Sequence, residues 1–190
     1  LQRSPLWSPS SGPGTEATVR VQDEAIKASE LRFVLDPTTL LLLITLNAEA
    51  LAKASTHCFV VTPQSVAMLR QWYLLERQNL RARGSMSLSE SGRLRMHEYG
   101  SSDRRMQRQF WRRVFQFVDT NCEMVEPQND DVAARGATFE AGVDTATLSA
   151  ITLAGERGWA LLAEETGARN LAQALGVSGV TSLQRLIAWA

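Results

Sequence analysis

The stretch GVDTATLSAITLAGERGWALLAEETGARNLAQALG, residues 142–176, decides the fold of this 190-residue chain. Its hydrophobic pattern predicts a helix over 144–157 and a short apolar strand over 159–164. A second helix is expected to begin at Thr166 and to end at Gly176. A buried strand between two helices is the repeating unit of an α/β protein.

Two of the predicted strands end in carboxylates. Glu164 and Glu165 follow one apolar run, and Asp36 follows another over 31–35. In α/β proteins, ligands and metals bind at the carboxyl ends of the strands. These acids therefore predict the beginning of a metal site. Two structural alternatives remain open. Asp36 can instead cap a helix, and the glutamates can be solvent-exposed residues at the start of a helix, where the helix dipole favours negative charge.

The rest of the chain continues the alternation of strands and helices. Further strands are expected over 57–62 and 122–127, a short strand or turn over 177–180, and further helices over 37–46, 63–80, 101–120 and 181–190. Alternating apolar residues around a glycine turn predict a β-hairpin near 84–100. The expected fold is α/β: a three-layer sandwich with a central, mainly parallel sheet flanked by helices, plus this inserted hairpin.

Composition and charge limit the classes of function. Residues 1–30 begin with a Ser-, Pro- and Gly-rich stretch and are expected to be a flexible linker, which leaves residues 31–190 as one domain. The chain has 20 basic and 20 acidic residues. With no net charge to attract nucleic acid, any such binding requires a local basic patch.

The cysteines and the apolar runs indicate the cellular compartment in which the protein is expected. Cys58 and Cys122 lie in separate apolar segments and are expected to be buried thiols, which fits a reducing, cytoplasmic compartment. The longest apolar run, 40–46, is too short to cross a membrane. The chain begins at Leu1 and not at methionine, so it is expected to be part of a longer protein.

The predicted helix over 101–120 is amphipathic. One side carries Arg104, Arg105 and Arg108, which could hold a phosphate backbone or form a solvated face. Packed beside the hairpin, this basic face would border the acidic site. In the helix before the hairpin, Glu76 could point inward toward a polar site or lie past the end of the packed face, and the second is expected.

From residue 31 to about 187 the chain resembles PIN domains, which are small metal-dependent nucleases. The strongest match is the run ATLSAITLAGERG, WALLA, Glu164–Glu165 and GARNLA with Arg169. The segments VLDPTTLLLL and FVVTPQSVAML resemble the family's first strand and helix and its second strand and helix.

The resemblance implies a set of acids that bind Mg²⁺ or Mn²⁺ and activate water against an RNA phosphodiester. Carried over to this chain, the catalytic acids are Asp36, Asp144, Glu164 and Glu165, with metal on Asp36, Glu164 and Glu165. In such a nuclease, the basic side of helix 101–120, with Arg104, Arg105 and Arg108, would hold the substrate backbone. The family also expects acids near Met68 and Thr147, where this chain has none. Asp144 lies one turn before Thr147 and could substitute, although capping a helix is its simpler role.

Three functions follow as hypotheses. The first is a PIN-like ribonuclease within a larger bacterial regulatory protein, with weak or absent activity because acids are missing. The second is a non-catalytic module on the same fold that binds RNA or a protein partner, including the rest of a longer chain. The third is an unrelated structural α/β domain. No membrane partner is expected, and the oligomeric state stays open.

Overall fold

The computed structural model describes residues 32–50, 58–81, 84–89, 92–98, 100–128 and 143–189. A five-stranded sheet has the order β5-β2-β1-β6-β7, and all its pairings are parallel. Its strands are β1 (Arg32–Leu35), β2 (Cys58–Val61), β5 (Cys122–Met124), β6 (Ala160–Leu162) and β7 (Val180–Thr181). A separate antiparallel hairpin pairs β3 (Gly84–Leu88) with β4 (Leu94–Glu98). The expected linker and its boundary at residue 30 lie outside the described residues.

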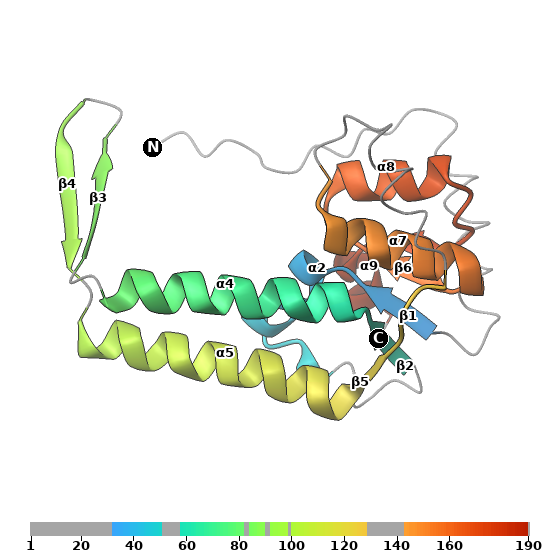
Figure 1. Ribbon diagram of the computed structural model, residues 1–190, viewed down its shortest axis with the longest axis horizontal. Helices are drawn as coiled ribbons and strands as arrows, with labels where there is room; N and C mark the ends of the chain where they lie inside the picture. Colours follow the sequence, from blue (N-terminus) through green and yellow to red (C-terminus); the bar gives the residue numbers. More distant parts are fainter. Residues whose placement is uncertain are drawn as a thin grey trace.

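Helices cover both faces of the sheet, as predicted (Figure 1). They are α2 (Pro37–Thr45), α4 (Pro63–Arg81), α5 (Ser101–Asn121), α7 (Thr145–Arg157), α8 (Thr166–Ala174) and α9 (Leu183–Trp189). One core cluster joins the sheet to α2, α4, α5 and α9, and a second joins it to α7 and α8. The three-layer α/β sandwich is therefore confirmed.

The central strand shows why the sequence specifies two cores. Phe33 and Leu35 of β1 lie in the first cluster, and Val34 between them lies in the second. Successive side chains of a strand point to opposite faces of the sheet. An apolar run without alternation therefore fits a strand that is covered on both sides. On the first face, the ring of Phe59 in β2 packs between Phe33 and Phe117.

Helices α4 and α5 lie side by side and extend away from the sheet, with the hairpin at their far end (Figure 1). Residues 63–121, which comprise α4, the hairpin and α5, are called the arm below. Tyr73 of α4 contacts the rings of Trp111 and Phe115 of α5, with centroids 5.8 and 5.9 Å apart. The Trp111 indole N–H donates to Glu76. The expectation that Glu76 lies past the packed face is wrong, because its carboxylate faces α5.

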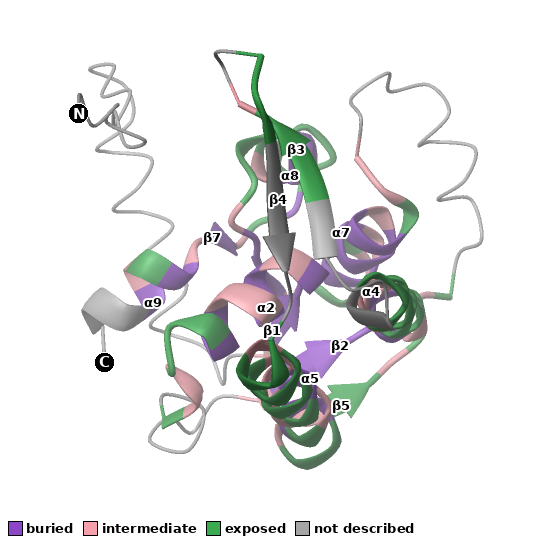
Figure 2. Ribbon diagram, turned by 90° about the vertical axis from the view of Figure 1, so that its left-hand side faces the viewer, coloured by how far each residue is buried: buried purple, intermediate pink, exposed green. Residues whose placement is uncertain are grey.

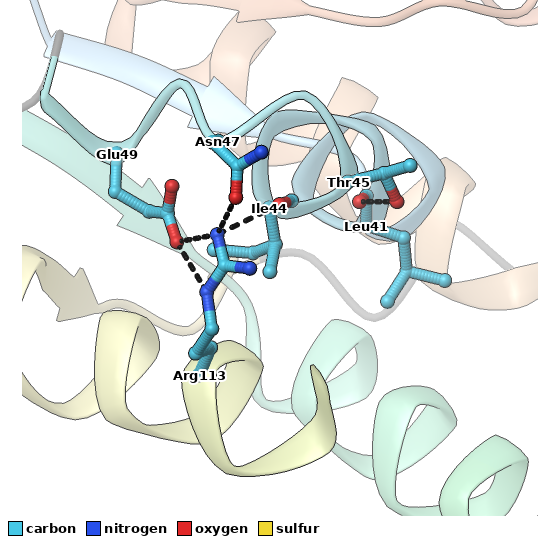
Figure 3. A network of polar contacts seen from close by, with 6 residues as sticks. All are labelled: Leu41, Ile44, Thr45, Asn47, Glu49 and Arg113. Carbon is cyan, nitrogen blue, oxygen red and sulfur yellow. Dashed lines mark hydrogen bonds and ion pairs between the residues drawn. The ribbon is translucent and has the colours of Figure 1, made fainter. Parts of the chain in front are cut away.

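A polar network fastens α5 to the end of α2 (Figure 3). Nε of Arg113 donates to Glu49 at 2.8 Å, and Nη2 donates to the same carboxylate. Nη2 also donates to the Ile44 carbonyl at 3.0 Å and to Asn47 Oδ1 at 2.8 Å. The last carbonyls of a helix lack partners within it, and the Ile44 carbonyl accepts from both the Asn47 amide and the guanidinium.

The two cysteines are free thiols, as expected, but both are only partly buried. Cys122 lies in register with Phe59 and packs on the α5 face, whereas Cys58 packs on the α7 face. Burial raises the pKa of the Cys122 thiol to about 12 and also raises that of Cys58. Both thiols are therefore protonated at neutral pH.

Among the described residues, no helix is long and apolar enough to cross a bilayer.

Candidate acidic site at the carboxyl edge of the sheet

Asp36 lies directly after β1 and caps α2. Its Oδ1 accepts a hydrogen bond from the Thr38 amide at 2.8 Å, and its Oδ2 accepts one from the Thr39 hydroxyl at 2.6 Å. Pro37 occupies the first helical position, where a missing N–H is tolerated. The side chain is almost wholly buried, at 1% exposure. The capping role predicted as an alternative is therefore present, whatever else Asp36 does.

Glu164 and Glu165, the two acids after β6, lie next to the Asp36 cap, but their carboxylates accept hydrogen bonds from different elements. Oε1 of Glu165 accepts a hydrogen bond from the Thr38 hydroxyl at 3.2 Å. The Glu164 amide donates to the Thr39 hydroxyl oxygen at 3.0 Å, and the Glu164 carboxylate accepts from the Leu183 amide of α9. Two threonines thus connect Asp36 to the β6 end, with Glu165 facing the cap and Glu164 directed to α9.

Burial raises the pKa of the Asp36 carboxyl above its ordinary value of 3.8. The hydrogen bonds from Thr39 and Thr38 act in the opposite direction, and the negative charge of Glu165 raises the pKa further. Removing a carboxylate from water disfavours its charged form, and a neighbouring carboxylate adds repulsion. The charge of Glu165 therefore acts on the Asp36 carboxyl.

Asp144 caps α7, which is the simpler of the two roles predicted for it. One oxygen accepts from the Ala146 and Thr147 amides at 2.9 and 2.8 Å, and the other accepts from the Thr147 hydroxyl at 2.9 Å. Both carboxylate oxygens therefore bind the first turn of the helix that follows. Gly158 ends the same helix with a φ of 65°, the left-handed conformation that glycine adopts most easily.

Arg169 fixes the turn between β6 and α8. Its Nη1 donates to the Ala163 carbonyl at 3.0 Å and to the Glu164 carbonyl, and its Nη2 donates to the Thr166 hydroxyl at 3.1 Å. These bonds hold the backbone on which Glu164 and Glu165 are mounted. The arginine of the GARNLA motif is therefore a positioning residue for the acidic site.

Sequence reasoning missed the hydroxyl groups at this edge. Thr39, Thr62, Ser65, Thr147 and Thr181 are all buried. Thr62 follows β2 and its hydroxyl bonds that of Ser65 at 2.9 Å, while the Thr181 hydroxyl has no partner among the described residues. A threonine or serine within a few residues of each apolar run is the signal that could have found most of them. Among them, Thr147 carries a hydroxyl where the family resemblance implies an acid.

The oxygen donors that are present do not fit a metal centre with several carboxylates. Mg²⁺ demands near-octahedral oxygen coordination and is bound through carboxylates and water. Among the described residues, no group of three or more His, Cys, Asp or Glu side chains is placed to hold an ion. Asp36 and Glu165 form a pair, and both oxygens of Asp36 already accept hydrogen bonds from α2.

Replacing Asp36 tests its capping role. Asp36→Ala is expected to lower the free energy of unfolding by about 1–2 kcal/mol, because the Thr38 amide and the Thr39 hydroxyl lose their acceptor. Asp36→Asn keeps an acceptor and removes the buried charge, so it should cost less at neutral pH.

The pH dependence of the same variants follows from the raised pKa of Asp36. A folded-state pKa above the unfolded value means that stability is lost as the pH rises through it. The wild type should therefore lose stability relative to Asp36→Asn as the pH rises from 3.8 through the raised value. Urea unfolding across this range measures the difference. An Asp36→Asn variant that is as unstable as Asp36→Ala at neutral pH would contradict this account.

The candidate substrate-binding arginines lie elsewhere. Arg104, Arg105 and Arg108 occupy the first two turns of α5, are exposed, and lie next to the hairpin. At 1.5 Å per residue, Arg105 is about 25 Å along the helix from β5. The first turns of α5 lie beside the hairpin, at the end of the arm away from the sheet, so the basic side chains gather toward that end (Figure 1).

Comparisons with known proteins agree with the fold. A crystal structure of PAE2754 from Pyrobaculum aerophilum superposes with a TM-score of 0.52 at 14% identity, covering 84% of this chain and 91% of that one. At this identity the likeness shows the fold alone. Comparison with curated proteins gives no match. The family model of the PIN domain associated with the TPR-GreAB-C-PIN system matches residues 34–174, from β1 to the end of α8. The chain therefore belongs to this PIN-domain family.

Proposed function

We propose that this PIN domain binds RNA as a module of a larger regulatory protein and cleaves RNA weakly or not at all. The observation that carries the proposal is that the acids at the carboxyl edge of the sheet accept structural hydrogen bonds from the protein. Asp36 and Asp144 cap helices with both oxygens, and Glu164 accepts from α9. These hydrogen bonds fix the carboxylates for capping, whereas catalytic acids must be placed for the reaction, and placement errors near 1 Å can reduce a rate by about 10²-fold.

The arm supports the RNA-binding part of the proposal. Residues 63–121 contain eleven arginines and five acidic residues, a net charge of +6. Because the whole chain is neutral, the other residues carry −6. On α5, exposed Arg104, Arg105, Arg108 and Arg112 share one side of the helix. A row of arginines at helical spacing supplies the contacts that hold a phosphate backbone irrespective of base sequence.

RNA affinity should respond to salt through these arginines. For single strands the logarithm of the binding constant falls with the logarithm of salt by about 0.7 per phosphate contact. Arg105→Ala and Arg108→Ala should each weaken binding to a short single-stranded RNA and make this slope less steep by about that amount. Fluorescence anisotropy at several salt concentrations measures both quantities.

The matched control is Arg157→Ala, which removes one exposed positive charge from α7, outside the arm. It should leave the RNA affinity and the salt slope near wild-type values. RNA binding that is insensitive to the two arm variants, or equally reduced by Arg157→Ala, would sink the proposal that the arm holds RNA.

A metal-dependent endoribonuclease is the second candidate function. The approach of Asp36 and Glu165 through Thr38 favours it, because a pair of carboxylates could hold Mg²⁺ or Mn²⁺ loosely. In this candidate Asp36, Glu164 and Glu165 hold the metal, and Asp144 assists. The donor set described above does not fit such a centre without further ligands, so weak activity at most is expected.

The same proposal covers the larger protein to which the domain belongs and its cellular compartment. The family description names a system with TPR and GreAB-C components, which supports a role beside other domains or protein partners. We place that larger protein in the cytoplasm of a bacterium. Two free thiols with raised pKa values suit a reducing compartment.

A further inference from the structure

Helix α4 carries a row of arginines that the proposed RNA contacts of α5 do not include. Arg70 and Arg77 are exposed and lie seven residues apart, so they point to the same side of the helix. The inward side of α4 is occupied by Tyr73 and Glu76, which contact α5. Arg70 and Arg77 are called the α4 row below. The exposed arginines of α5 are called the α5 row: Arg104, Arg105, Arg108 and Arg112.

The two rows lie on the same side of the arm. Helices α4 and α5 are antiparallel, because the hairpin that joins them stands at the far end of the arm (Figure 1). Glu76 of α4 contacts Trp111 of α5, and the residues that follow these two are Arg77 and Arg112. One residue turns a helix by about 100°, and in an antiparallel pair the same step from a shared contact leads to the same side on both helices. Figure 2 looks along the arm and shows the two helices end on, with exposed outer turns.

Together the rows form a basic face, whose width and length follow from helix geometry. The axes of packed helices are about 8–10 Å apart, and the steps from Arg104 to Arg108 and Arg112 cover about 12 Å. Exposed Asp119 lies on the same side of α5, seven residues after Arg112 toward the sheet. The face is therefore most basic around Arg77, Arg108 and Arg112.

Two lines of positive charge suit a double-stranded RNA better than a single strand. A double helix carries twice the phosphate charge per unit length of either of its strands. In A-form RNA the two strands face each other across a deep, narrow major groove, and proteins recognise the double helix through its shape and its phosphates. Two rows of arginines on neighbouring helices can therefore each lie along one strand.

The composition of the exposed surface points the same way. Proteins that bind single-stranded RNA stack its bases on aromatic side chains. Where the structure describes side chains, no Phe, Tyr or Trp is exposed, and the large exposed apolar residues are leucine and methionine. The described part of the arm therefore supplies contacts to phosphates without a platform for unpaired bases.

We propose that the arm binds double-stranded RNA, with the α4 row on the phosphates of one strand and the α5 row on those of the other, across the major groove. This assignment rests on the proposed RNA binding by the arm and names the form of RNA that is bound. A single strand can follow only one row, and the α5 row has more arginines. Arg77 is therefore expected to contribute to the binding of a duplex but not of a single strand.

Fluorescence anisotropy with the full chain tests this assignment. The probes are an RNA duplex of about 16 base pairs, the length that a double-strand-binding domain spans, and one of its strands, with a sequence that does not pair with itself. The wild type should bind the duplex at least about 10-fold more tightly. Arg77→Ala should weaken duplex binding several-fold, make its salt slope less steep by about 0.9 and leave binding of the strand near the wild-type value. Arg108→Ala should weaken the binding of both probes.

Two further variants control for charge and for folding. Arg157→Ala removes the same charge outside the arm and should leave both affinities unchanged. Arg77→Lys keeps the charge and should retain most of the duplex affinity, because a phosphate contact needs a positive charge. Circular dichroism checks that each variant remains folded.

The outcomes separate this assignment from RNA binding itself. A duplex that binds no more tightly than its strand, or an Arg77→Ala variant that weakens both probes equally, would overturn the assignment to double-stranded RNA and leave RNA binding by α5 intact. If the wild type bound neither probe, RNA binding by the arm would fail, and the assignment with it.

Discussion

Replacing Phe59 with alanine is expected to lower the free energy of unfolding by about 3–5 kcal/mol. Phe59 is 1% exposed, and its ring centroid lies 6.1 Å from those of Phe33 and Phe117. The ring therefore joins β1 and β2 to α5, and its loss leaves a cavity that three separate elements line. Urea unfolding followed by circular dichroism measures the change.

A matched control for this variant is Phe110→Ala. Phe110 is the same residue type, lies on α5, the helix against which Phe59 packs, and is only partly buried at the edge of the core. Its loss should cost clearly less than that of Phe59, because less apolar surface leaves water. Equal destabilisation by the two variants would mean that the aromatic cluster around Phe59 does not hold α5 to the sheet.

Replacing Arg113 with alanine is expected to cost about 2 kcal/mol, since the hydrogen bonds to Glu49, Asn47 and the Ile44 carbonyl are lost together. Arg113→Lys should recover little, because an ammonium cannot reproduce the planar fork of donors. Thermal unfolding of both variants measures this.

Arg112→Ala is the matched control for the Arg113 network. Arg112 precedes Arg113 on α5, is exposed, and carries the same charge. Its loss should change the free energy of unfolding by at most about 0.5 kcal/mol, as for most surface substitutions. A neutral Arg113→Ala variant would show that the network in Figure 3 adds nothing to the attachment of the arm.

The fold could be predicted because its signals are local. The run Phe33–Leu35 has no polar interruption, Pro37 marks a helix start, and Gly158 marks a helix end with a positive φ. The hairpin follows from alternation around Gly92, which also has a positive φ. Each of these features depends on a few adjacent residues, so a single sequence carries them.

The site could be predicted only in part, because its geometry depends on contacts distant in sequence. Adjacent Glu164 and Glu165 look equivalent in the sequence, yet one binds the amide of Leu183 and the other faces Thr38. Glu76 was misplaced for the same reason, since its partner Trp111 is 35 residues away. Helical periodicity shows which residues share a face but not which neighbour covers that face.

The most direct test of the central claim is thermal unfolding in millimolar Mn²⁺, comparing the wild type with Asp36→Asn. A metal that binds only the folded state raises the melting temperature. Because the Asp36 oxygens serve as a helix cap, we expect no rise in either protein. A rise in the wild type that Asp36→Asn abolishes would contradict the account and establish a working metal centre.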